Sequence, residues 1–188
     1  MSANLKRGLL ASLAIVMFAG CGSESSYTVT PENTTNPFGF DFQTGSLPQP
    51  KEPADNPATQ EKFQLGRHLF YDTKLSGNQT MSCESCHQQA LAFSDGLAVP
   101  TGSTGEVLHR NSQTLTNIGY NASYTWANPI LKEIEQQLVI PLFGEFPVEM
   151  GINDSNRETI LERFRTDVDY LNRFKSTKEN FRRCSKIN

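Results

Sequence analysis

The feature that most constrains this chain is the run Cys83-Glu84-Ser85-Cys86-His87, a C-x-x-C-H motif. Such a run is typical of c-type haem attachment. Two intervening residues let one helical turn place both thiols along one edge of a porphyrin, where they can add to its two vinyl groups. The imidazole of His87 then reaches the iron from one axial side. The motif therefore predicts Cys83 and Cys86 as attachment residues and His87 as the metal ligand.

A cysteine pair has three other interpretations: a thioredoxin-type redox motif, a structural disulfide, or half of a zinc site. A redox motif belongs in a βαβ context, which this sequence does not show. A zinc site needs a second pair of ligands. The remaining candidates, His68, His109 and Cys184, do not form such a pair at ordinary spacing. The sequence therefore favours haem c.

Residues 1–20 have the features of a lipoprotein signal peptide. Lys6 and Arg7 precede an apolar run over residues 9–18, which is too short to cross a membrane as a helix. Small residues before Cys21 resemble the bacterial lipoprotein cleavage box, which makes Cys21 the candidate lipidated residue. The alternative is an ordinary secretory signal. Both predict export to the periplasmic side of the cell envelope, and the absence of Asp at position 22 favours the outer membrane.

Composition divides the rest of the chain into three parts. Residues 21–55 are rich in Ser, Thr, Asn, Pro and Gly, which predicts a flexible tether. Residues 56–175 provide one domain's worth of chain. Residues 176–188 turn basic and lose periodicity, and we expect an aberrant or truncated tail there. The formal net charge of −3 argues against nucleic acid as a partner, and the lipid anchor is the one expected membrane contact.

Apolar periodicity predicts an all-α domain with long loops, and the C-x-x-C-H motif makes a cytochrome c-like haem domain the expected fold. The predicted helices span residues 57–71, about 112–118, 129–138 and 154–175. Asn111 or Ser112 is expected to cap the second of them. The glycine-rich segment 94–110 is a candidate cover for the side of the haem that faces away from His87.

The second axial position of the iron has no obvious ligand in the sequence. His68 lies in a predicted helix and His109 in the glycine-rich loop, and each is more simply a histidine with an ordinary structural role. Met81 is too close to the motif, and Met150 comes late in the chain. The sequence thus allows an open iron position at which peroxide could bind.

Two further side chains are candidates for roles near a haem. Arg110 could pair with a haem propionate, since a guanidinium pairs well with a carboxylate; a surface arginine is the alternative. Trp126 is the only tryptophan. It could pack in the core, and it is also an easily oxidised side chain.

Several stretches over residues 60–155 follow one another in an order found in a known family. They are Leu65–Asp72, Leu75-Ser76, Cys83–His87, Arg110-Asn111-Ser112, Trp126, Gln137 with Pro141, and Pro147–Gly151. In this order they resemble the bacterial di-haem cytochrome c peroxidase and MauG family. Gln88–Phe93, Thr125–Pro129 and Pro141–Glu145 most resemble one branch, the MbnH-type di-haem enzymes, which are found beside methanobactin-type copper-binding partner proteins.

The resemblance implies a role for each matching residue. Glu149 would be the distal acid/base that moves a proton between the oxygens of peroxide. Gln137 would shape the distal pocket, with Gln136 as the alternative, and Trp126 would relay electrons. In the peroxidases a distal histidine precedes the Arg-Asn-Ser motif by several residues. Because no histidine stands there in this sequence, the resemblance favours a permanently open haem.

The resemblance also implies an activity. The expected function is that of a peroxidase-type oxidoreductase that uses hydrogen peroxide to oxidise a partner protein, either a protein electron donor or a copper-binding partner. Family members continue into a second domain with another C-x-x-C-H motif, whereas this sequence ends at Asn188. We therefore expect the N-terminal half of such an enzyme. The alternative is a lipid-anchored mono-haem electron-transfer cytochrome.

Overall fold

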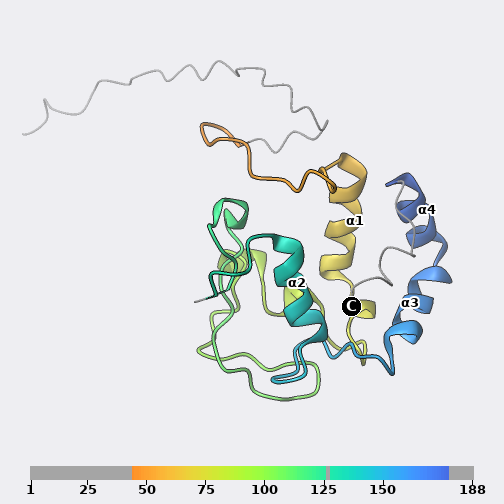
Figure 1. Ribbon diagram of the computed structural model, residues 1–188. Helices are drawn as coiled ribbons and strands as arrows, with labels where there is room; N and C mark the ends of the chain where they lie inside the picture. Colours follow the sequence, from red (N-terminus) through yellow and green to blue (C-terminus); the bar gives the residue numbers. More distant parts are fainter. Residues whose placement is uncertain (1–43, 126–127, 178–188) are drawn as a thin grey trace, which may run out of the picture. The chain divides into compact units, whose positions relative to one another are not determined.

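The computed structural model describes residues 44–125 and 128–177. Their regular structure is helical, with α1 at Gln60–Tyr71, α2 at Ile134–Phe143, α3 at Arg157–Arg165 and α4 at Val168–Ser176 (Figure 1). No strand forms in these two ranges, where backbone pairing between loops is limited to isolated bridges. The all-α prediction is confirmed for this part of the chain. None of the helices described is long and apolar enough to span a membrane.

A side-chain cap precedes α1, and a different side-chain hydrogen bond lies at the start of α2. Helix α1 begins at Gln60 rather than at residue 57, because the hydroxyl of Thr59 accepts a hydrogen bond from the Lys62 amide at 3.2 Å. Helix α2 was expected over residues 129–138 and instead runs over 134–143. The side chain of Gln136 accepts from the Lys132 amide at 3.0 Å, which satisfies a free donor just before the helix.

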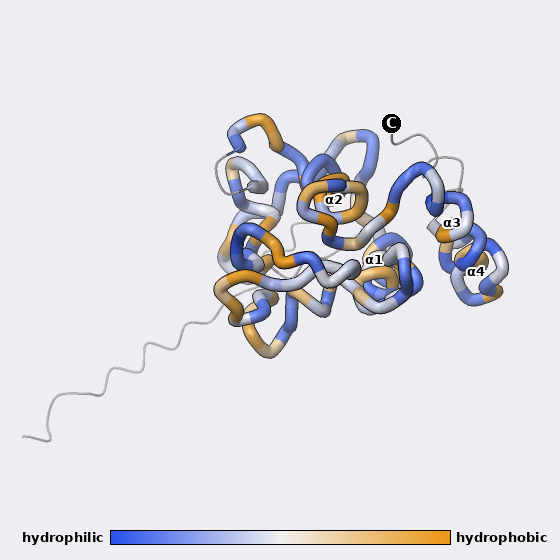
Figure 2. Tube along the Cα trace, turned by 90° about the horizontal axis from the view of Figure 1, so that it is seen from below, coloured by the Kyte–Doolittle hydropathy of each residue, from blue (hydrophilic) through white to orange (hydrophobic). Residues whose placement is uncertain are grey.

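Helix α2 also extends further than expected, past Pro141. A proline inside a helix removes one backbone hydrogen bond. Here the loss falls in the last turn, which the amide of Gly144 closes by donating to the Ile140 carbonyl at 2.8 Å. Figure 2 shows that much of α2 is apolar, although none of its residues is buried.

The predicted helix over residues 112–118 is wrong. Residues 111–115 are irregular, and only a 3₁₀ turn at Ile118–Tyr120 follows. The side chains of this segment bind elsewhere: Gln113 Nε2 donates to the Tyr124 carbonyl at 2.8 Å, and Thr116 donates to the Ala92 carbonyl at 3.1 Å. These long-range bonds outweigh the local preference for a helical turn.

The core lies where α1, α3 and α4 pack together. Leu65, Ile152, Ile160, Phe164 and Tyr170 are its buried members. The apolar face predicted for residues 154–175 is confirmed at Ile160 and Phe164, which are 2% and 3% exposed. Helices α3 and α4 are separate, since Asp167 caps α4 by accepting from the amides of Asp169 and Tyr170. The core thus fixes α1, which also contacts the Cys83–Ser85 turn.

Arg163 of α3 stabilises the turn that leads from α1 toward the C-x-x-C-H motif. Its guanidinium donates to the carbonyls of Lys74, Ser76 and Gly77 at 2.7–2.9 Å. We expect Arg163→Met to lower the free energy of unfolding by about 3 kcal/mol, because three half-buried carbonyls lose a charged donor. Urea unfolding of the haem-free chain measures this.

A matched control lies two residues further along α3. Arg165 reaches Glu158 at 3.1 Å in an ion pair whose carboxylate is largely exposed. We expect Arg165→Met to cost less than about 1 kcal/mol. Equal losses for the two variants would show that the three carbonyl contacts of Arg163 add no stability.

Candidate functional site

The C-x-x-C-H motif adopts the helical turn that its spacing predicts. Residues Cys83–Ser85 form a 3₁₀ turn, and the Cys83 carbonyl accepts from the amides of Cys86 and His87 at 3.2 Å and 3.0 Å. Ser82 precedes the turn, and its amide donates to the Ser85 hydroxyl at 3.1 Å. The turn therefore brings both cysteines and His87 onto one short stretch of fixed backbone.

Both cysteines of the motif are free and half-buried. Burial raises the pKa of the Cys83 thiol and that of the Cys86 thiol. The charges of Asp95 and Glu149 raise the pKa of Cys86 further, while a hydrogen bond with Ser112 lowers it. The two side chains are thus neutral thiols at neutral pH, which suits addition of S–H across a vinyl group rather than metal binding as thiolates.

A backbone carbonyl fixes the ring of His87. Nδ1 lies 3.0 Å from the carbonyl oxygen of Phe93, and since a carbonyl can only accept, Nδ1 carries the proton. Nε2 is then left with its lone pair for a metal. Histidine ligands of metals usually have such a second partner, which sets the tautomer and the ring orientation.

The position of the Phe93 carbonyl depends on an unusual turn. Ala92 and Phe93 both have positive φ, 56° and 59°, in a region that non-glycine residues seldom adopt. The hydroxyls of Thr114 and Thr116 both donate to the carbonyl of Ala92 and hold the turn from outside. The role of Phe93 could not be predicted from the sequence, because nothing near it in the chain indicates this conformation.

The distal candidates lie on α2 and on the segment that follows it. Gln137 belongs to α2, and its Oε1 is buried without a hydrogen-bond partner among the described residues. Glu149 is half-buried, and it is near enough to Cys86 for its charge to affect that thiol. The Met150 amide donates to the Pro141 carbonyl at 2.9 Å, which aligns the Glu149 segment with the end of α2.

The other candidates differ in how well they are placed. Arg110 and His109 are exposed, and the ring of His109 lies 5.5 Å from that of Phe146. His68 lines a cavity of about 470 Å³ together with Tyr71 and Tyr170. Partial burial and the charges of Arg173 and Arg67 lower the pKa of His68. Trp126 and Cys21 lie outside the described residues.

These features fit a covalently bound haem. The two free thiols and the lone pair of His87 Nε2 match its attachment groups and its iron. The unpartnered Oε1 of Gln137 is a buried polar atom that still needs a partner. Apolar side chains near these groups are also uncovered: Leu91 is 45% exposed, and Leu138 of α2 is 45% exposed. A large apolar cofactor would cover such surface.

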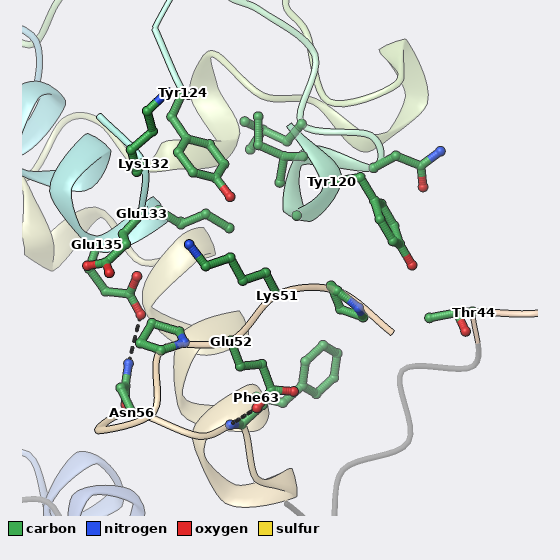
Figure 3. A pocket seen from close by; sticks show the side chains of 18 of the residues that line it. Thr44, Lys51, Glu52, Asn56, Phe63, Tyr120, Tyr124, Lys132, Glu133 and Glu135 are labelled. Atoms are coloured by element: carbon green, nitrogen blue, oxygen red, sulfur yellow. Dashed lines mark hydrogen bonds between the residues drawn. The ribbon is translucent and has the colours of Figure 1, made fainter. Parts of the chain in front are cut away.

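A second cavity, of about 640 Å³, lies where residues 44–58 pass the start of α1 and the start of α2 (Figure 3). Asn56 joins the two helices there, since its side chain accepts from Lys62 Nζ at 2.8 Å and donates to Glu135 at 2.9 Å. The Tyr120 hydroxyl donates to the Pro48 carbonyl at 2.7 Å. Residues 44–55 of the expected tether therefore contact the domain, and residues 21–43 lie outside the described ranges.

The sequence of this domain matches a known protein family. The family model for di-haem cytochrome c peroxidase matches residues 60–187. The chain belongs to the di-haem cytochrome c peroxidase family. This match begins at the first residue of α1 and includes the C-x-x-C-H turn, Gln137 and Glu149.

Individual relatives agree with this assignment. A cytochrome-c peroxidase of Denitromonas iodatirespirans is 36% identical over 133 residues, which cover 70% of this chain and 34% of that protein. The methylamine utilization protein MauG of Methylorubrum extorquens is 30% identical over 131 residues, which cover 70% of this chain and 35% of that protein. The chain thus spans about a third of the length of these curated relatives.

A solved structure resembles this fold closely. The crystal structure of a MauG-like protein associated with microbial copper homeostasis superposes with a TM-score of 0.71 and 48% sequence identity. The superposition covers 73% of this chain and 39% of the other. The family implies haem c as the cofactor and a cytochrome c-like fold for this domain.

Burial raises the pKa of Glu149, and this has a consequence for stability. The folded chain holds a proton on Glu149 at pH values where the unfolded chain, with a pKa near 4.5, has released it. Stability therefore falls as pH rises from that value through the raised pKa. We expect haem-free Glu149→Gln to gain stability over the wild type as pH rises through this window. Urea unfolding midpoints of the wild type and the variant at about pH 4 and pH 7 measure this gain. An equal difference between the two proteins at both pH values contradicts the prediction.

Proposed function

We propose that this chain supplies the haem domain of a peroxidase-type oxidoreductase in which hydrogen peroxide oxidises a partner protein. The observation that carries the proposal is Glu149, a half-buried carboxyl with a raised pKa, held beside the haem-attachment turn. A carboxyl with a pKa raised toward neutrality can both accept and donate a proton, as acid/base catalysis requires.

Glu149 is assigned the proton transfer that peroxide cleavage needs. Reduction of hydrogen peroxide to two water molecules consumes two electrons and two protons. The Glu149 carboxylate takes a proton from one peroxide oxygen and returns it to the other, so that this oxygen leaves as water. When bound, the haem supplies the iron that binds peroxide and the electrons for cleavage of the O–O bond.

Other residues hold the cofactor and shape the pocket. Cys83 and Cys86 would form the thioether links to haem c, and His87 Nε2 would bind its iron. The amide of Gln137, whose Oε1 is buried without a partner in the described part of the chain, orients peroxide. Arg110 pairs with a haem propionate. Trp126 relays electrons between the haem and the partner.

The place of the protein in the cell follows from its N-terminal sequence. We assign residues 1–20 to a lipoprotein signal peptide, Cys21 to lipid attachment and residues 21–55 to a tether. The haem domain is then exported to the periplasm and held at the outer membrane. The MauG-like structural relative is associated with copper homeostasis. This supports the MbnH-type branch and favours a copper-binding protein as the partner over a small cytochrome.

A second candidate is an electron-transfer cytochrome. The C-x-x-C-H turn and the fixed ring of His87 would hold haem c in such a protein as well as in a peroxidase. The two functions differ in the sixth coordination position of the iron. A carrier has both axial positions filled, is low-spin and does not react with peroxide. A peroxidase haem has an open position, is high-spin and reacts.

The test uses the 188-residue chain exported from a host that attaches haem c. We expect an intact mass that includes one haem, a high-spin ferric spectrum, and a spectral change within seconds of mixing with hydrogen peroxide. A low-spin spectrum with no change on mixing would establish the electron carrier. His109→Ala and His68→Ala would then identify the additional ligand.

A further inference from the structure

The backbone of Glu149 is held by a small loop that the catalytic proposal does not use. Residues Thr101 and Val107 pair across this loop, which spans residues 101–107. Within it, the Gly102 amide donates to the Glu106 carbonyl at 2.8 Å, and the Gly105 amide donates to the Gly102 carbonyl at 3.0 Å. Gly105 has φ of +88°, which suits glycine. The 101–107 loop is therefore a closed, internally bonded unit.

The 101–107 loop contacts the amide of Val148 and the carbonyls of Val148 and Glu149. The Glu106 carboxylate accepts from the Val148 amide at 3.0 Å. The Ser103 amide donates to the Glu149 carbonyl at 2.7 Å. Gly102 packs so closely that a Cβ there would overlap the Val148 carbonyl oxygen. Three contacts thus fix the orientation of residues 148 and 149.

The same segment is held from its other side as well. The Met150 amide donates to the Pro141 carbonyl of α2 at 2.9 Å, and the Gly77 amide donates to the Met150 carbonyl at 2.8 Å. Among all these contacts, that of Glu106 is the only one made by a carboxylate side chain. A charged acceptor binds an amide about twice as strongly as a neutral one.

We propose that Glu106 is a positioning residue for the distal carboxyl Glu149: by accepting from the Val148 amide, it sets the direction in which the Glu149 side chain leaves the backbone. The inference rests on the proposed role of Glu149. Glu106 acts through the backbone rather than through its charge, since the raised pKa of Glu149 has burial as its cause. A misplacement of about 1 Å at a catalytic group can slow a reaction 100-fold.

The test compares three substitutions of Glu106 in the haem-loaded full chain. Glu106→Ala removes the acceptor, and Glu106→Asp keeps the charge but is one methylene too short to reach the Val148 amide. We expect both to slow the reaction with hydrogen peroxide about tenfold, with the resting spectrum unchanged. Glu106→Gln keeps an acceptor at the same reach and should restore the rate to within about twofold. Glu145→Ala, an exposed carboxylate in the same segment, is the matched control and should react like the wild type.

A second readout does not depend on activity. Amide hydrogen exchange of the peptide containing Val148 should be faster in Glu106→Ala and Glu106→Asp than in the wild type, Glu106→Gln and Glu145→Ala. This comparison can be made on haem-free protein too. If Glu106→Ala fails to fold, Glu106→Asp carries the same comparison with a smaller change.

The outcomes separate the inference from the proposal on which it rests. A Glu149→Gln variant that reacts like the wild type overturns the proposed role of Glu149. If Glu149→Gln is slow while Glu106→Ala and Glu106→Asp react at the wild-type rate, the positioning role is overturned. Unchanged exchange at Val148 in both Glu106 variants overturns it too. Faster exchange with a slower reaction, both restored in Glu106→Gln, supports it.

Discussion

Replacing Glu149 with Gln slows the reaction of the haem-loaded chain with hydrogen peroxide by about 100- to 10,000-fold, the range lost when a positioned acid/base is removed. Glutamine has nearly the same shape, and it cannot accept the peroxide proton. The resting optical spectrum stays the same, because His87 rather than Glu149 binds the iron in this assignment. Stopped-flow mixing with peroxide measures the rate.

The pH dependence of the same reaction provides a further check. Because the pKa of Glu149 is raised by burial, the carboxylate form is lost at a higher pH than for an ordinary glutamate. The wild-type rate should therefore fall as pH drops through that raised pKa, and the rate of Glu149→Gln should not show this fall. Glu145→Gln changes an exposed neighbour and is the control. It should keep both the wild-type rate and the fall of that rate at low pH. A wild-type rate in Glu149→Gln would place the acid/base on another residue.

Local chemistry in the sequence was enough to predict the attachment turn and the helices of the core. The spacing of Cys83, Cys86 and His87 requires one helical turn, and the structure has it. The apolar spacing of Ile160 and Phe164 predicts a buried helix face, and both are buried. Such features can be predicted from the sequence because the residues that determine them are within one or two helical turns of one another.

Features that depend on distant partners could not be predicted in this way. Residues 112–118 have a good cap and were expected to be helical, but Gln113 and Thr116 bind to residues that lie 11 and 24 positions away. The Phe93 carbonyl reaches His87 through two positive-φ residues without glycine. Gly102 lies in the glycine-rich segment 94–110, and its missing side chain makes room for the Val148 carbonyl, a contact 46 positions along the chain.

The candidate site shows the same division. Cys83, Cys86 and His87 are close in the chain, so that the motif alone predicts their common role. Glu149 is 63 residues beyond Cys86, and only the resemblance to a family connected them before the structure showed that the Glu149 charge raises the pKa of the Cys86 thiol. Glu106 carried no signal at all, because its contact is with the backbone amide of a residue 42 positions away.

Removing both thiols of the motif has the second large effect. We expect Cys83→Ala/Cys86→Ala to carry no covalently attached haem, because each thioether needs a cysteine sulfur and His87 alone holds haem by a bond to iron. Intact mass under denaturing conditions measures this, since denaturation releases a haem bound only through its iron. The fixed ring of His87, with Nδ1 bonded to the Phe93 carbonyl, still leaves Nε2 for the metal in this variant.

The two single variants and a matched cysteine complete that experiment. Cys83→Ala and Cys86→Ala should each keep one thioether and show a shifted pyridine haemochrome spectrum, because one vinyl group remains unsaturated. Cys184→Ala removes a cysteine outside the motif and should keep the full haem content. If the double variant still carries covalent haem, attachment does not use the C-x-x-C-H turn. If the double variant contains non-covalent haem, only the thioether links have been lost, since the pocket and His87 still bind the cofactor.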